Sequence, residues 1–217
     1  MYRRLVGEKR ERVSTVLANP DRKSSLQTAR TALAPAVHLN LILEHFGMFL
    51  GHLTADPTLI MSQGQNFRIG LYVEDDGYLV PLEAISINDR RRDPFNTYQT
   101  HRDHYNLSET NAPAHLVRCI QQRALIICED CQVAADAGEF IYFNDTQRSY
   151  LKSMLAYPLL DFWEPRGLHC RGAVGIDTDV AGYFCEADRE LLRALLDELA
   201  VRLQLESAIR ALIDKPG

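Results

Sequence analysis

Residues 149–199 constrain the fold most, because two strand-like runs are followed there by a strongly amphipathic segment. The first run, residues 150–160, is mostly apolar, and the second, residues 170–177, is short and holds two glycines. Pro165 and Gly167 lie between the runs and indicate a hairpin loop. The amphipathic segment has leucines at helical spacing: Leu192, Leu195, Leu196, Leu199 and Leu203. The stretch therefore predicts two antiparallel strands followed by a long helix.

Three short motifs occur in this stretch in a fixed order. They are Ser153-x5-Pro158-Leu159, then Gly172-x2-Gly175-Ile176-Asp177, then Phe184-x3-Asp188. Together they resemble the C-terminal half of a GAF domain, and the resemblance extends over residues 26–212. It implies an α/β (α+β) fold with a central antiparallel sheet, long terminal helices on one face, and ligand-covering loops and short helices on the other. It also implies a non-catalytic sensory domain that binds a small molecule in signal transduction.

The residues before this stretch predict the rest of the sheet. Residues 67–73 alternate apolar and other side chains, so one face of a strand is apolar. The Asp75-Asp76-Gly77 sequence is a hairpin signal, and residues 78–87 return as the partner strand. Residues 114–122 predict a short helix, and residues 124–128 predict a compact buried strand.

Residues 24–53 and 186–212 predict two long terminal helices. Pro35 interrupts the first, which either kinks there or begins again with Pro35 in its first turn. Both helices have apolar side chains on more sides than one sheet can cover, so we expect a homodimer. The expected interface residues are Phe46, Phe49, Leu50, Leu195 and Leu199. Three histidines at seven-residue intervals are expected to form a polar stripe on the dimer helix: His38, His45 and His52.

The charge distribution separates an N-terminal arm from the domain. Residues 1–30 hold eight Lys or Arg and three Asp or Glu, a net +5, and the formal total of −5 leaves −10 for the remainder. We expect residues 1–23 to be a basic arm, disordered or juxtamembrane, and residues 24–214 to be a single GAF-like domain. Such an arm leaves contact with a membrane open, whereas we expect no nucleic-acid partner.

Hydropathy and cysteine content indicate the compartment. No apolar run reaches the roughly 20 residues of a membrane-spanning helix, and the N-terminus lacks the apolar segment of a signal peptide. The five cysteines are an odd number without an evident disulfide framework. We therefore expect a reducing, cytoplasmic location.

The long polar segment of residues 88–111 is the expected ligand-binding region. A loop of this length inside a domain is usually functional or disordered, and its arginines match phosphate or carboxylate groups. We expect an anionic or nucleotide-like small molecule in a cleft between the sheet and residues 88–146, although a solvated loop face would look the same. The expected contacts are Arg90, Arg91, Arg92, His101, Arg102, His104 and Tyr105. The sequence identifies no ligand, cofactor, output domain or protein partner.

Cys128 and Cys131 form a CxxC motif in a region expected to be a variable connection, residues 129–146. A zinc site would need two more ligands, and a thioredoxin-like site would open a helix. Because the pair ends a strand, we expect Cys128 in the core, Cys131 in a loop, and no metal. A cysteine-based redox or metal module and a ligand-free dimerisation module remain the alternatives to a sensory domain.

Enzymatic activity is not expected from the motifs present. Free-methionine-sulfoxide reductases are GAF enzymes whose cysteines would lie near Asn111-Ala112-Pro113 and Gln147-Arg148, where this chain has none. Cyclic-nucleotide GAF domains carry an Asn-Lys pair where this chain has Asp177-Thr178. No metalloprotease helix, phosphate loop or nucleophile elbow occurs.

Overall fold

The computed structural model describes residues 35–53, 67–87, 102–110, 112, 114–163 and 169–214. The strands are β1 (Phe67–Asp75), β2 (Tyr78–Ile87), β3 (Ile126–Cys128), β4 (Ser153–Trp163) and β5 (His169–Thr178). The helices are α3 (Pro35–Leu53), η1 (Arg102–Tyr105), α6 (His115–Gln122), α7 (Cys131–Asp136), α8 (Asp145–Tyr150), η2 (Glu186–Asp188) and α9 (Arg189–Asp214). Within these residues, no helix has the length and apolarity that crossing a membrane requires.

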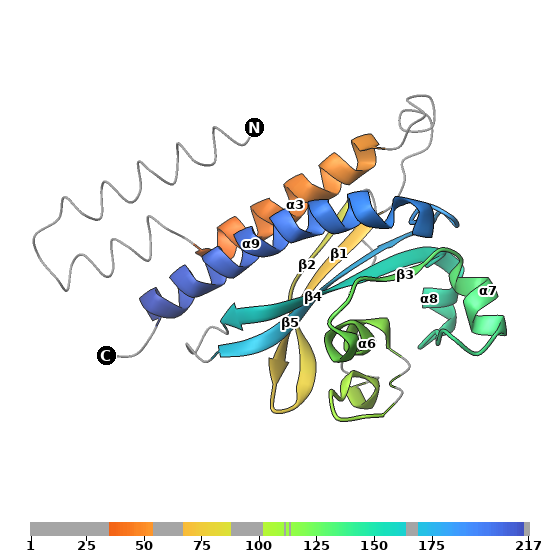
Figure 1. Cartoon of the computed structure of the whole chain (residues 1–217), viewed down its shortest axis with the longest axis horizontal. Coiled ribbons are helices and arrows are strands. Elements are labelled where there is room, and N and C mark those ends of the chain that lie inside the picture. The colour runs from red at the N-terminus through yellow and green to blue at the C-terminus, as the bar shows by residue number, and fades with distance from the viewer. Residues whose placement is uncertain are drawn as a thin grey trace, which may run out of the picture.

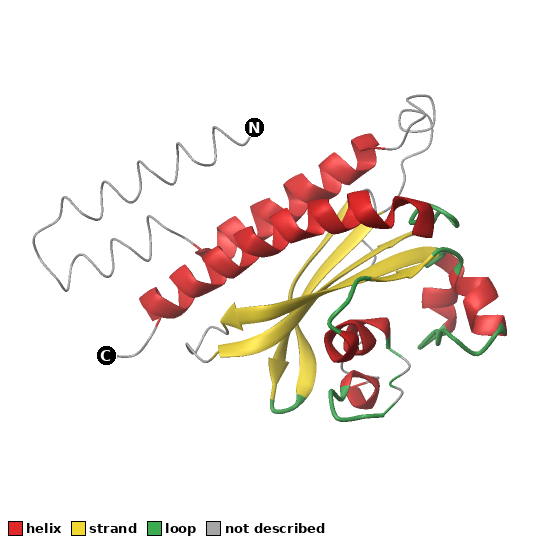
Figure 2. Ribbon diagram, viewed as in Figure 1, coloured by secondary structure: helices red, strands yellow, loops and turns green. Residues whose placement is uncertain are grey.

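All five strands form one antiparallel sheet in the order β2-β1-β5-β4-β3. The long helices α3 and α9 lie side by side on one face, and the shorter helices lie on the other side (Figure 1; Figure 2). This arrangement confirms the predicted fold class. The predicted hairpin is also present, because Asp76 and Gly77 both have positive φ, as a tight two-residue turn requires.

The two faces of the sheet carry different side chains, because residues alternate sides along a strand. On β1 the apolar residues Phe67, Ile69, Leu71 and Val73 belong to the core beneath the long helices. The residues between them lie on the opposite face, where Tyr72 belongs to a second core with α6 and the following segments. The sequence alternation therefore predicted the helix-covered face of β1 correctly.

The long helices cover this first core from outside. Leu39, Leu43 and Leu50 of α3 pack into it together with Leu196 and Leu203 of α9. Helix α3 begins at Pro35, where a residue without a backbone N–H and with a fixed φ is tolerated. The expected helix of residues 24–34 lies outside the described residues.

Residues 129–150 contain two short helices, where the residues alone predicted a connection and the resemblance implied ligand-covering loops and short helices. Asp130 caps α7 by accepting hydrogen bonds from the backbone N–H groups of Gln132 and Val133, at 2.9 and 3.1 Å. Asn144 caps α8 by accepting from Gln147 N at 2.7 Å. The prediction that Cys131 lies in a loop is wrong: it is the first residue of α7 and is fully buried. These helices are too short to show a clear apolar period, so only their caps signal them.

Leu43→Ala tests the packing of α3 on the sheet. Leu43 is fully buried, so the variant leaves a cavity and should lose about 2–5 kcal/mol of unfolding free energy, measured by urea denaturation. Met48→Ala on the same helix is the matched control: its side chain is 40% exposed and the loss should stay near 0.5 kcal/mol. Equal losses in the two variants would contradict this packing.

Candidate functional site

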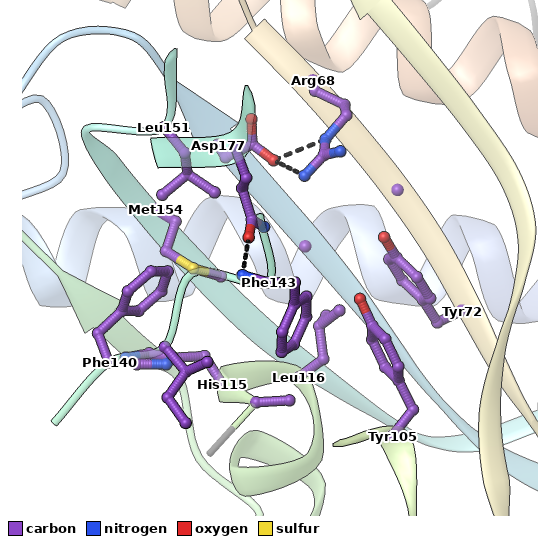
Figure 3. A pocket seen from close by; sticks show the side chains of 15 residues that line it. Arg68, Tyr72, Tyr105, His115, Leu116, Phe140, Phe143, Leu151, Met154 and Asp177 are labelled. Atoms are coloured by element: carbon purple, nitrogen blue, oxygen red, sulfur yellow. Dashed lines mark hydrogen bonds and ion pairs between the residues drawn. The ribbon is translucent and has the colours of Figure 1, made fainter. Parts of the chain in front are cut away.

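A cavity of about 40 Å³ lies between the second face of the sheet and the segments that cover it. The sheet contributes residues of β1, β4 and β5, and the cover consists of η1, the start of α6, and residues 140–151 (Figure 3). One water molecule needs about 10–15 Å³ of cavity volume. The cavity therefore has room for roughly three waters or a ligand of a few heavy atoms.

Two paired glycines, Gly70 and Gly175, form part of the cavity floor. Gly70 of β1 pairs with Gly175 of β5, which pairs with Ala156 of β4. A Cβ on Gly70 would come within 2.6 Å of the Tyr72 ring, and one on Gly175 within 3.0 Å of Leu116 Cδ2. Larger residues at these two positions would therefore displace the cavity walls.

A buried ion pair closes one end of the cavity. Arg68 and Asp177 are cross-strand partners, and both Nε and Nη2 of the guanidinium donate to the same carboxylate oxygen, at 2.7 and 2.5 Å. Their side chains are 9% and 7% exposed. Burial alone would lower the pKa of Arg68, but the Asp177 carboxylate outweighs it and the pKa lies above its ordinary value. Arg68 therefore stays charged inside the protein.

Two tyrosines extend this polar end. The rings of Tyr72 and Tyr105 are stacked with centroids 6.1 Å apart, and their hydroxyl groups point toward the ion pair (Figure 3). Burial raises the pKa of both phenols, so they are neutral donors at physiological pH. The other end is lined by apolar side chains, including Leu116, Phe140 and Met154. The cavity is thus amphipathic.

His115 adds a further polar group to the cavity wall. It is the first residue of α6 and is buried, with its ring 5.1 Å from that of Phe140. In the described part of the chain, its Nδ1 has no hydrogen-bond partner. A buried polar atom without a protein partner is a place where a water molecule or a ligand can bind.

The structure brings one of the seven predicted ligand contacts to the cavity, which is Tyr105. His104 stacks on Phe143, a cavity residue, with ring centroids 5.1 Å apart, but does not itself line the cavity. Arg102 is exposed and lies 4.5 Å above the Tyr78 ring, outside the lining. The other four predicted contacts lie outside the described residues: Arg90, Arg91, Arg92 and His101.

The predicted interface residues are not equally accessible. Leu50 and Leu199 are buried in the core of the single chain, at 2% and 3% exposure, so a second subunit could not contact them directly. Phe46 and Leu195 are partly buried, and Phe49 is 44% exposed. Among the described side chains of the two long helices, the large apolar ones that are exposed are Met48, Phe49, Leu191, Val201 and Leu205.

The described histidines of α3, His38 and His45, differ in their surroundings. His38 is buried, and its Nδ1 lies 3.7 Å from a carboxylate oxygen of Glu206 on α9. His45 is partly buried, and nothing is described of the His52 side chain. His38 therefore links the two long helices of one chain.

The structure describes all five cysteines, and none of them forms a disulfide. Among the residues that the structure describes, no three or more His, Cys, Asp or Glu side chains are grouped so as to hold a metal ion. The CxxC cysteines are both buried, in the same core as the cavity wall.

Comparison with known proteins gives similarity at the level of the fold. No protein-family model matches the chain, and no curated protein does. The chain is similar to the GAF domain of a two-component sensor histidine kinase from Bacillus halodurans, with 15% identity, a TM-score of 0.44, and coverage of 77% of this chain and 94% of that one. A GAF domain/HD domain protein from Geobacter sulfurreducens has 14% identity, a TM-score of 0.44, and coverage of 80% and 97%.

An enzyme is also among the similar structures. Free methionine-R-sulfoxide reductase from Neisseria meningitidis, in complex with its substrate, has 13% identity, a TM-score of 0.42, and coverage of 90% of this chain and 95% of that one. The solved structures similar to this chain thus include both GAF-domain proteins and a reductase.

Most residues that line the cavity were not predicted from the sequence, including Arg68, Tyr72, His115 and Gln147. One signal was available in the sequence. Arg68 is a charged residue, and its position in the alternation places it on the face of β1 opposite to the apolar residues. Its partner Asp177 ends one of the quoted motifs. A charge on each of two paired, buried strands indicates an ion pair, but the register needed to place them opposite each other comes only from the structure.

Asp177→Asn tests the energetic importance of the ion pair. Removing one partner leaves the Arg68 charge buried and should cost about 3–5 kcal/mol in unfolding free energy, measured by urea denaturation. The double variant Arg68→Met/Asp177→Leu removes both charges and should be more stable than Asp177→Asn.

A second pair on the same sheet supplies the control. Arg171 and Glu74 also form an ion pair, at 2.7 Å, but their side chains are 46% and 24% exposed. Glu74→Gln should therefore cost no more than about 1 kcal/mol. A loss in Asp177→Asn no greater than in Glu74→Gln would contradict the role assigned to the buried pair.

Proposed function

We propose that this chain is a non-catalytic sensory or regulatory domain of GAF type, which binds a small molecule in the cavity and transmits its state through dimeric terminal helices. The observation that carries the proposal is the amphipathic cavity, with a charged pair and two phenols at one end and apolar side chains at the other. Binding sites for small molecules typically combine an apolar lining with a few placed polar groups. A cytoplasmic location is part of the proposal and agrees with five cysteines that form no disulfide in the described residues.

The dimensions and chemistry of the cavity define the ligand class. A volume of about 40 Å³ suits a small organic acid of a few heavy atoms, and a nucleotide would require the covering segments to move away. The carboxylate would bind at the Arg68 end and accept hydrogen bonds from the neutral Tyr72 and Tyr105 hydroxyls. The apolar end would exclude water from the rest of the ligand.

Transmission would pass through the sheet, because the cavity and the long helices lie on opposite faces of the same strands. The Tyr157 hydroxyl of β4 hydrogen-bonds Asp197 of α9, and Tyr183 donates to the Leu50 carbonyl of α3 at 2.7 Å. A ligand shifts the helices only to the extent that it binds one of their arrangements more tightly. The expected coupled element is therefore the pair α3 and α9.

Thermal shift with a panel of short-chain carboxylates tests the binding site. Saturating ligand should raise the melting temperature, because a molecule that binds only the folded state stabilises it. Tyr105→Phe removes one hydroxyl and keeps the ring, so affinity measured by calorimetry should fall about 10- to 100-fold, the effect of a hydrogen bond to a charged group.

Arg102→Ala is the matched control, because Arg102 is exposed on the Tyr78 ring and should leave affinity unchanged. If Arg102→Ala weakens binding as much as Tyr105→Phe, the site lies at the loop surface and not in the cavity. If no member of the panel shifts the melting temperature, the chain is better described as a ligand-free dimerisation module.

Dimerisation through the long helices is tested separately by light scattering at micromolar concentration. At 100° per residue, Leu191, Val201 and Leu205 fall within about 80° of one another on α9, so they form one exposed apolar stripe. Burying each such side chain contributes roughly 1.5–3 kcal/mol before entropic costs. Leu205→Glu and Phe49→Glu should therefore shift the wild-type dimer toward monomer.

Val133→Glu provides the control for these charge substitutions. Val133 is 66% exposed on α7, away from the long helices, and its substitution should leave the dimer intact. A well-folded wild-type monomer at micromolar concentration would refute the dimer.

A further inference from the structure

His115 places a polar group in the part of the cavity that is otherwise apolar. Its ring lies beside Phe140, whereas Arg68 and Asp177 lie at the far side of the cavity (Figure 3). The residue is only 6% exposed. The cavity therefore has polar groups at both ends, a charged pair at one and an imidazole at the other.

Packing of the neighbouring segments holds the imidazole in this position. His115 is the first residue of α6, and one turn later Arg118 donates to the Glu139 carbonyl at 3.2 Å. This contact keeps the segment with Phe140 against α6. Phe140 in turn packs edge-to-face on Tyr142, with ring centroids 4.9 Å apart. A side chain that is already ordered in the free protein loses little freedom when a ligand binds.

The described residues leave hydrogen-bonding capacity open at His115. Its Nδ1 is buried and has no hydrogen-bond partner among them. Buried polar atoms in proteins are usually hydrogen-bonded, and an unsatisfied one costs free energy. By contrast, Gln147 Oε1 already accepts from Phe143 N at 2.7 Å. His115 is thus a polar side chain of the lining that a ligand can satisfy.

We propose that the ligands of this cavity are short hydroxycarboxylic acids, and that His115 is the residue that selects them. The carboxylate binds at the Arg68 end, as in the proposed function on which this inference rests. The hydroxyl group at the other end of the ligand hydrogen-bonds the His115 imidazole. The carbon chain between the two groups packs on apolar side chains such as Leu116 and Met154.

The surroundings of His115 favour a hydroxyl over other second groups. A neutral imidazole has one donor and one acceptor nitrogen, and a hydroxyl both donates and accepts, so it fits either tautomer. A keto oxygen only accepts. A second carboxylate or an ammonium would bring a charge next to Phe140, Leu116 and Met154, none of which can balance it.

Calorimetry of the full chain with three pairs of acids tests the selection. Each pair has nearly the same shape, because a hydroxyl group in one member replaces a methyl group in the other: glycolate and propanoate, 3-hydroxypropanoate and butanoate, 4-hydroxybutanoate and pentanoate. In at least one pair, the hydroxy acid should bind about ten-fold or more tightly than its partner. A smaller preference in every pair would overturn the inference.

Two variants of similar size test whether the preference comes from His115. His115→Leu removes the hydrogen-bonding group, so the preference for the hydroxy acid should disappear. His115→Asn keeps a donor and an acceptor close to the position of the ring nitrogen Nδ1, so the preference should be retained. Persistence of the preference in His115→Leu, or its equal loss in both folded variants, would refute the role of His115. The wild-type pairs remain decisive if a variant does not fold.

The same titrations separate this inference from the proposed function. If butanoate and the other methyl acids bind and the hydroxy acids gain nothing, the cavity is a carboxylate site and only the selection by His115 is wrong. If neither member of any pair binds, the proposed binding function is wrong as well.

Discussion

The buried pair of Arg68 and Asp177 is the interaction on which the second face of the sheet depends. A strand that slips by one residue turns every side chain to the opposite face, which would place these charges in the apolar core under the long helices. The cross-strand pairing of the two residues therefore fixes the register of β1 against β5. In that register Gly70 faces Gly175, and the aligned glycines create the cavity floor. The charged end and the open floor of the site thus have one structural cause.

The same face combines features that cost stability with features that offset the cost. Glycines within strands contribute no side-chain packing, and two buried charges must be desolvated. The tyrosine rings, Leu116 and Phe140 provide the opposing apolar burial around the cavity. The core of the first face consists mainly of aliphatic and aromatic side chains beneath α3 and α9. This division explains how one domain can keep a stable sheet and a polar cavity together.

The sequence predicted the parts of the fold that have a long, regular apolar pattern. The alternation in β1 predicts a strand and its core face, and the leucines of α9 predict a helix and its core face. The Asp76-Gly77 sequence predicts the turn between β1 and β2. The sequence pattern did not predict elements that are too short to show a period. Helices α7 and α8 have six residues each, and only their caps, Asp130 and Asn144, mark them. The site was predicted from charge density in one loop, and of the three predicted residues that the structure describes, only Tyr105 reaches the cavity. The cavity residues come from strands and helices distant in sequence, so register and packing had to be known first.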